Sequence, residues 1–97
     1  MSILLDVLNE EYERSCRIID SLKAEIDSLP RGYISRKKIN GKEYCYIQYR
    51  EGGKVKSRYI RPEQVDEVKK QIARRKSLEK QLRERKLDRD RLKKVLG

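Results

Sequence analysis

The chain has 97 residues, of which 36% are apolar and 43% are charged, and it contains no Phe, Trp or His. This balance excludes a thick globular core, whereas long helices that pack along narrow seams tolerate it because most of their surface stays in water. The formal net charge of +10 favours a polyanionic partner such as nucleic acid, an anionic membrane surface or an acidic protein.

The charge is distributed unevenly along the chain. Residues 1–30 hold seven acidic and three basic residues, residues 31–61 hold two and ten, and residues 62–97 hold seven and thirteen. We expect one domain, residues 1–97, made of a first helix (1–30), a basic β-meander (31–61) and a second helix (62–96). Positive charge is therefore concentrated in the meander and in the second helix.

The first segment has the pattern of a long amphipathic helix. Its apolar residues recur at alternating steps of three and four, which is typical of a coiled-coil seam, and Ser15 interrupts them once. Pro30 disfavours helical geometry at the preceding residue, so the helix ends there. A second apolar flank, which includes Val7 and Ile18, is available to another neighbour. The seam residues are Leu5, Leu8, Tyr12, Ile19, Leu22 and Ile26.

Two turns, Asn40-Gly41 and Gly52-Gly53, divide the middle segment into three antiparallel strands, because both pairs suit the positive φ angles of a type I′ hairpin turn. Two-residue turns place Ile47 opposite Ile34 and Arg58. We expect the face with Ile and Cys to pack on the helices and the face with Tyr, Lys and Gln to be solvated; a core lined by tyrosines is the alternative. The first face has Ile34, Cys45, Ile47 and Ile60, with Arg36, Lys38, Tyr49, Lys56 and Arg58 at its edges, and the second has Tyr33, Ser35, Lys37, Tyr44, Tyr46, Gln48, Arg50, Val55, Ser57, Tyr59 and Arg61.

The last segment predicts a second long helix. Pro62 suits the first helical turn, and the apolar residues Val65, Val68 and Ile72 begin its seam. The order of elements predicts an α+β fold: a long helix, a three-stranded antiparallel meander and a long helix, with the helices paired antiparallel in a coiled-coil-like manner. Dimerisation through the first-helix seam is an alternative that heptads alone do not distinguish, and self-association stays open.

The sequence contains no recognisable set of catalytic residues. Histidine, the usual general base and commonest metal ligand, is absent, and no Gly-rich phosphate loop opens a helix. Cys16 and Cys45 are isolated, which is the pattern of reduced cysteines in a cytoplasmic protein. No stretch is apolar enough to span a membrane. We therefore expect a cytoplasmic non-enzyme without catalytic residues, metal or cofactor.

Basic and aromatic residues alternate along the meander, which holds five of the six tyrosines of the chain. Lys and Arg neutralise phosphates, Tyr stacks on unpaired bases, and polar side chains read base edges. This combination favours nucleic acid as the partner. The alternatives are a protein-binding surface and a sheet whose lysines only prevent aggregation.

The run YCYIQYREGGKVKSRYI (residues 44–60) resembles a β-meander of short prokaryotic proteins and of some insertion-element transposases. Three strands followed by a helix also resemble the arm-type DNA-binding domains of phage and transposon integrases. Those domains lay the sheet in the major groove, and the resemblance implies DNA rather than RNA as the partner. They lack the long first helix, which leaves room for a protein-directed role. The residues expected to contact nucleic acid are Lys37, Tyr46, Gln48, Arg50, Lys54, Lys56 and Arg58, together with Arg61.

The sequence thus predicts a small nucleic-acid-binding accessory or regulatory protein of a mobile element, phage or prokaryotic host. The alternative is a protein-binding adaptor or inhibitor, for example of a host-defence or nucleic-acid enzyme, that acts through its helix pair.

Overall fold

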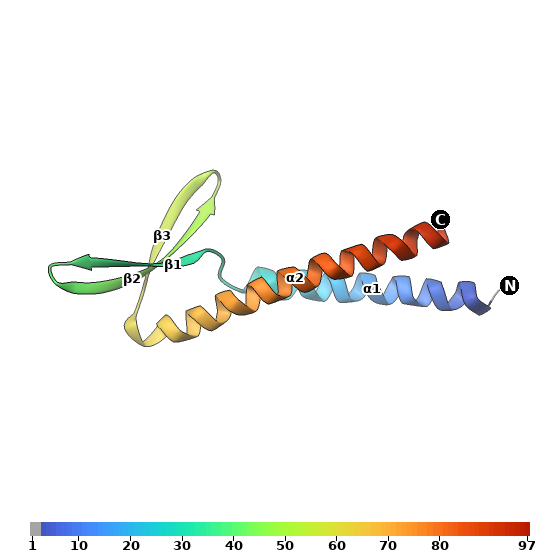
Figure 1. The fold of residues 1–97 in the computed structure, drawn as a ribbon, viewed down its shortest axis with the longest axis horizontal. Coiled ribbons are helices and arrows are strands. Elements are labelled where there is room, and N and C mark those ends of the chain that lie inside the picture. The colour runs from blue at the N-terminus through green and yellow to red at the C-terminus, as the bar shows by residue number, and fades with distance from the viewer. Residues whose placement is uncertain (1–2) are drawn as a thin grey trace. The chain divides into compact units, whose positions relative to one another are not determined.

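A computed structural model describes residues 3–97 and has the predicted order of a long helix, three strands and a second long helix (Figure 1). The fold is therefore α+β, as the sequence predicts. Met1 and Ser2, which begin the predicted first helix, lie outside the described residues. The elements are α1 (Ile3–Ser28), β1 (Tyr33–Ile39), β2 (Lys42–Glu51), β3 (Lys54–Ile60), the 3₁₀ helix η1 (Pro62–Gln64) and α2 (Val65–Leu96).

The contacts within the chain define two compact units. The sheet unit runs from Leu29 to Arg75 and contains the three strands and the beginning of α2. The helix unit combines α1 with the part of α2 that begins at Lys76. Because the division falls inside α2, this one helix contributes side chains to both units.

In the sheet unit, the strands follow one another in the order β1-β2-β3 and pair antiparallel. The turn residues 40–41 and 52–53 all have φ between 51° and 78°, as a type I′ turn requires. These turns set the predicted register, in which Ile47 of β2 lies opposite Ile34 of β1 and Arg58 of β3.

A small apolar cluster lies beneath the sheet. Its central members are Ile47 and Ile60 of the sheet and Ile72 of α2, which are 2%, 3% and 8% exposed. The prediction that the face with Ile and Cys is buried is therefore confirmed. The residues that pack partly buried against this cluster are Ile34, Cys45, Val65 and Val68.

The apolar pattern of α2 changes face along the helix. Its sequence predicts Val65, Val68 and Ile72 in the interhelical seam, whereas the structure places them in the cluster beneath the sheet, which corrects that assignment. The physical reason is the step of six residues from Ile72 to Leu78. At 3.6 residues per turn this step rotates the apolar position by about 120° around the helix. Helix α2 therefore has two apolar faces, of which the first packs beneath the sheet.

In the helix unit, α1 and the second part of α2 run antiparallel along each other, as predicted (Figure 1). Ile19, Ile26 and Leu78 are buried. Ser15, the one polar residue in the apolar pattern of α1, is also buried and therefore occupies a seam position. Leu5, near the end of the seam, is 46% exposed. The half-buried seam residues are Leu8, Tyr12 and Leu22.

The chain enters the sheet through a tight passage at Gly32. This residue has φ +109°, and a Cβ atom on it would lie 2.0 Å from the carbonyl oxygen of Gln48. Just before it, the carbonyl oxygen of Leu29 accepts a hydrogen bond of 2.7 Å from Nη1 of Arg75. Both features lie within the sheet unit. The hydrogen bond ties Leu29 to α2, and the absence of a Cβ atom on Gly32 lets the backbone pass close to β2.

Candidate nucleic-acid interface

Alternation along the strands gives the sheet two distinct faces. The inner face carries Cys45, Ile47 and Ile60, which form or adjoin the apolar cluster. The opposite face is here called the outer face. It consists of the strand residues that alternate with those of the inner face and of their cross-strand partners. The outer face consists of Tyr33, Ser35, Lys37 and Ile39 of β1, Lys42, Tyr44, Tyr46, Gln48 and Arg50 of β2, and Val55, Ser57 and Tyr59 of β3.

Carboxylates are confined to the inner face. Among strand residues 33–60, all of which the structure describes, the acidic residues are Glu43 and Glu51, and both have inner-face parity. Glu43 lies 3.7 Å from the guanidinium of Arg36, and Glu51 lies 3.6 Å from the amine of Lys56. The outer face therefore carries cationic side chains without an acidic neighbour on the same face, which gives it a positive field.

Three tyrosine rings form one patch on the outer face, here called the tyrosine cluster. The ring of Tyr59 on β3 lies 6.2 Å from that of Tyr44 and 5.8 Å from that of Tyr46, centroid to centroid. These separations and tilted orientations are favourable for aromatic pairs. The amine of Lys37 lies 5.2 Å from the centroid of the Tyr46 ring, so a cation from β1 borders the patch.

The structure separates the residues expected to contact nucleic acid. Lys37, Tyr46, Gln48 and Arg50 come together on the outer face, which fits one contact surface. Arg61 follows β3 and is the exposed N-cap residue of η1. The members with inner-face parity are Lys54, Lys56 and Arg58.

The inner-face cations have other surroundings. Lys56 is paired with Glu51. Arg58 lines a groove of about 430 Å³ together with Gln64 of η1 and Glu67 of α2. These side chains therefore do not share a face with the outer-face members of the expected set. The reason is strand alternation, since neighbouring cations on one strand point to opposite faces.

The outer face also contains Lys42, Tyr44 and Tyr59, which the expected contact set omits. The sequence indicates that these residues lie on the outer face, because the hairpin register places them on the same face as Tyr46. Ranking residues by type alone selects the basic side chains of β3 instead. Register and parity together therefore give the composition of each face, which residue type alone does not.

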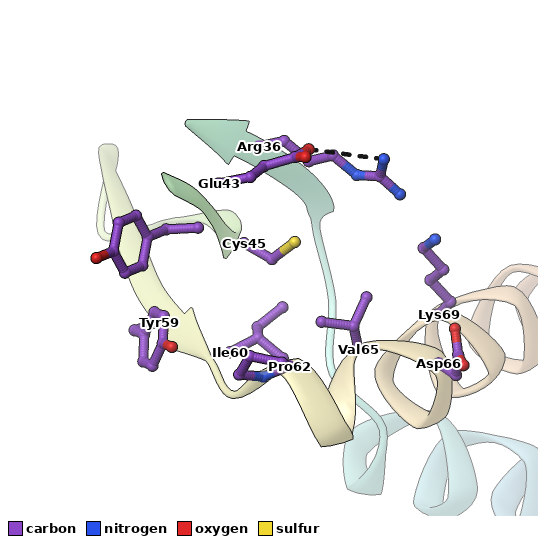
Figure 2. A pocket seen from close by; sticks show the side chains of 10 residues that line it. Arg36, Glu43, Cys45, Tyr59, Ile60, Pro62, Val65, Asp66 and Lys69 are labelled. Carbon is purple, nitrogen blue, oxygen red and sulfur yellow. Dashed lines mark ion pairs between the residues drawn. The ribbon is translucent and has the colours of Figure 1, made fainter. Parts of the chain in front are cut away.

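A second hollow, of about 310 Å³, lies on the inner side between the strands and the start of α2 (Figure 2). Its lining combines apolar residues such as Ile60 and Val65 with two basic and two acidic side chains. Figure 2 shows the sulfur of Cys45, a free and half-buried thiol, directed into this space. The charged residues of its lining, Arg36, Glu43, Asp66 and Lys69, have formal charges that sum to zero.

Two further observations concern residues 3–97 as described. No helix there is long and apolar enough to cross a bilayer. No group of three His, Cys, Asp or Glu residues in that range is arranged to hold a metal ion.

Comparison with known proteins gives one result. A protein-family description, the domain of unknown function DUF6788, matches residues 12–70, which is more than half of the chain. The matched segment contains the whole sheet and most of α1. Searches of curated proteins and of solved structures found no match. The chain therefore belongs to the DUF6788 family.

Proposed function

We propose that the protein is a small non-catalytic accessory or regulatory factor that binds nucleic acid through the outer face of its sheet. The observation that supports this proposal is the sorting of charge by strand parity. Both carboxylates of the strands are inner-face residues paired with cations, whereas the outer face combines Lys37, Lys42 and Arg50 with four tyrosines. The resemblance of the meander to mobile-element proteins supports a prokaryotic or phage origin and a cytoplasmic location.

The outer face offers what a phosphate backbone requires. Lysine and arginine release condensed counterions when they neutralise phosphates, and each such contact contributes about 0.9 to the slope of log K against log salt for duplex DNA. Gln48 at the centre of β2 adds an amide that can donate to and accept from a base edge. Because the outer-face cations have no carboxylate on their own face, their charge remains available to a ligand.

The test compares two variants with the same change in net charge. The outer variant combines Lys37→Gln, Lys42→Gln and Arg50→Gln, and the inner variant combines Lys38→Gln, Lys54→Gln and Arg58→Gln. Fluorescence anisotropy with labelled mixed-sequence oligonucleotides is measured between about 50 and 200 mM salt. We expect the outer variant to lose about two to three units of salt slope and the inner variant to retain the wild-type slope.

Two results would contradict the proposal. Equal losses in both variants would show that net charge, and not the outer face, holds the ligand. Wild-type protein that binds neither duplex nor single-stranded oligonucleotide at the lowest salt would overturn nucleic-acid binding itself. Circular dichroism of both variants verifies that the fold is retained.

A second candidate function is that of a protein-binding adaptor or inhibitor acting through the helix unit. It is favoured by the exposed apolar residues at the beginning of α1, where Ile3, Leu4 and Val7 are 82%, 67% and 48% exposed. The last turn of α2, in the same unit, carries Lys93 and Lys94. Apolar and basic groups together fit an amphipathic partner helix with an acidic polar side.

This candidate is tested with Val7→Lys combined with Ile18→Lys. Both residues belong to the apolar flank of α1, and neither is buried. We expect a partner identified by affinity purification to be lost from this variant while the circular dichroism spectrum stays unchanged. Recovery that survives these changes but is lost in the outer variant would place protein binding on the sheet instead.

A further inference from the structure

We infer, on the basis of the proposed function, that the outer face selects single-stranded nucleic acid and stacks unpaired bases on the tyrosine cluster. The proposal concerns the class of ligand and the residues that discriminate it. It depends on the placement of three rings and of the cations that border them on the same sheet face.

The tyrosine cluster is a continuous aromatic patch. Tyr59 contacts the rings of both Tyr44 and Tyr46, so the patch crosses from β3 to β2. Tyr59 is 47% exposed, so almost half of its surface is accessible to a ligand. Such a patch suits any base, because every base has a π-face and stacking on an aromatic side chain contributes about 1 to 3 kcal/mol per base.

Stacking distinguishes single strands from a duplex. In a duplex the π-faces of the bases are covered by neighbouring base pairs, so a protein reaches only base edges in the grooves. The tyrosine cluster occupies the centre of the outer face, where a duplex reader needs side chains that project to those edges. The rings therefore contribute fully only when the bases are unpaired.

The cations lie where a strand on this patch requires them. Lys42 and Arg50 lie at opposite ends of β2, with Tyr44, Tyr46 and Gln48 between them on the same face. At about 3.3 Å per residue, the eight steps from Lys42 to Arg50 span about 26 Å. A nucleic-acid strand that follows β2 thus meets a cation, two rings, an amide and a second cation in succession.

The test measures affinity for labelled oligo-dT, oligo-rU and a mixed-sequence duplex between about 50 and 200 mM salt. The stacking variant combines Tyr44→Leu with Tyr59→Leu, and the control is Tyr49→Leu, a tyrosine of β2 with inner-face parity that is not part of the cluster. We expect wild-type protein to bind at least one single strand about tenfold or more tightly than the duplex. The stacking variant should lose about 10- to 100-fold of that affinity and keep both its duplex affinity and its salt slope.

The result for oligo-dT against oligo-rU identifies which kind of single strand carries the effect. Tyr44→Phe with Tyr59→Phe keeps the rings and should retain the wild-type preference, which separates stacking from loss of the hydroxyls. Duplex bound as tightly as single strands, or a stacking variant that behaves as the wild type, overturns this inference and leaves outer-face binding of nucleic acid intact. Absence of binding to all three probes overturns both.

Discussion

At the scale of single residues, the position of a residue along its strand determines whether its side chain lies on the inner or the outer face of the sheet. Residues 43 and 51 are glutamates with inner-face parity, and each is ion-paired with a cation on that face. These pairs are half-exposed, so each contributes little to stability. The consequence of this parity is electrostatic, because it leaves the strand face that carries the tyrosines without a carboxylate.

Gly32 is the residue at which backbone geometry is most restrictive. We expect Gly32→Ala to destabilise the protein by about 2 to 4 kcal/mol, because the new Cβ would clash with the backbone of Gln48 and the residue keeps a positive φ. The free energy of unfolding is measured by urea titration.

The control for Gly32 is Gly41→Ala in the first hairpin turn. Gly41 also has a positive φ, +78°, but no atom lies within 4 Å of the position that a Cβ atom would occupy there. Its cost is then only that of the left-handed backbone, about 1 kcal/mol. Equal effects of the two substitutions would show that the contact with Gln48 is not restrictive.

At the scale of elements, the sequence predicts the sheet more completely than it predicts the helices. Asn40-Gly41 and Gly52-Gly53 are two-residue turns, and such turns determine which residues lie opposite each other. Pro30 and Pro62 mark the limits of the sheet for equally local reasons. Local backbone chemistry therefore accounts for the order and the register, and the apolar side chains of one parity account for the buried face.

Helix α2 is less predictable because its apolar residues serve two neighbours. The helical spacing of Val65, Val68 and Ile72 gives α2 an apolar face that could pack against either a sheet or another helix. Only the tertiary packing decides which neighbour it covers. The expected contact set is likewise divided between the two faces of the sheet, since residue type alone does not state on which face Lys56 or Arg58 lies. For the helix the deciding information is tertiary, whereas for the strands it is the register that the two turns set.

We expect Leu78→Ala to lower the free energy of unfolding by about 2 to 5 kcal/mol, because Leu78 is 2% exposed and its removal leaves a cavity in the helix unit. The control on the same helix is Leu87→Ala. Leu87 is 57% exposed, and its replacement should change stability by less than about 0.5 kcal/mol. Thermal unfolding followed by circular dichroism measures both, and a large effect of Leu87→Ala would show that its side chain is covered.

At the scale of the whole molecule, the fold combines two small cores with one shared helix. Ile72 of α2 belongs to the core of the sheet unit, and Leu78, further along α2, is buried in the helix unit. Neither core is large, as the low apolar content requires. A helix that fulfils both roles links the stability of one unit to that of the other through its own backbone.

We therefore expect the chain to unfold as the single domain that its sequence predicts. Five of the six tyrosines lie in residues 31–61, so tyrosine fluorescence reports on the sheet, whereas circular dichroism at the helical minimum reports mainly on α1 and α2. The two signals should change at the same urea concentration. A sheet signal that is lost well before the helical signal would instead indicate two independently folding units.

The parity of β2 has a consequence for how the protein can diversify. Residues 45 and 47 of this strand belong to the core, whereas residues 44, 46 and 48 face outward and belong to no buried cluster. Core residues and residues of the face proposed to bind nucleic acid thus alternate along this ten-residue strand. The proposed ligand preference can therefore be varied, for example with a library at the three outward positions, without replacing any residue of the buried cluster.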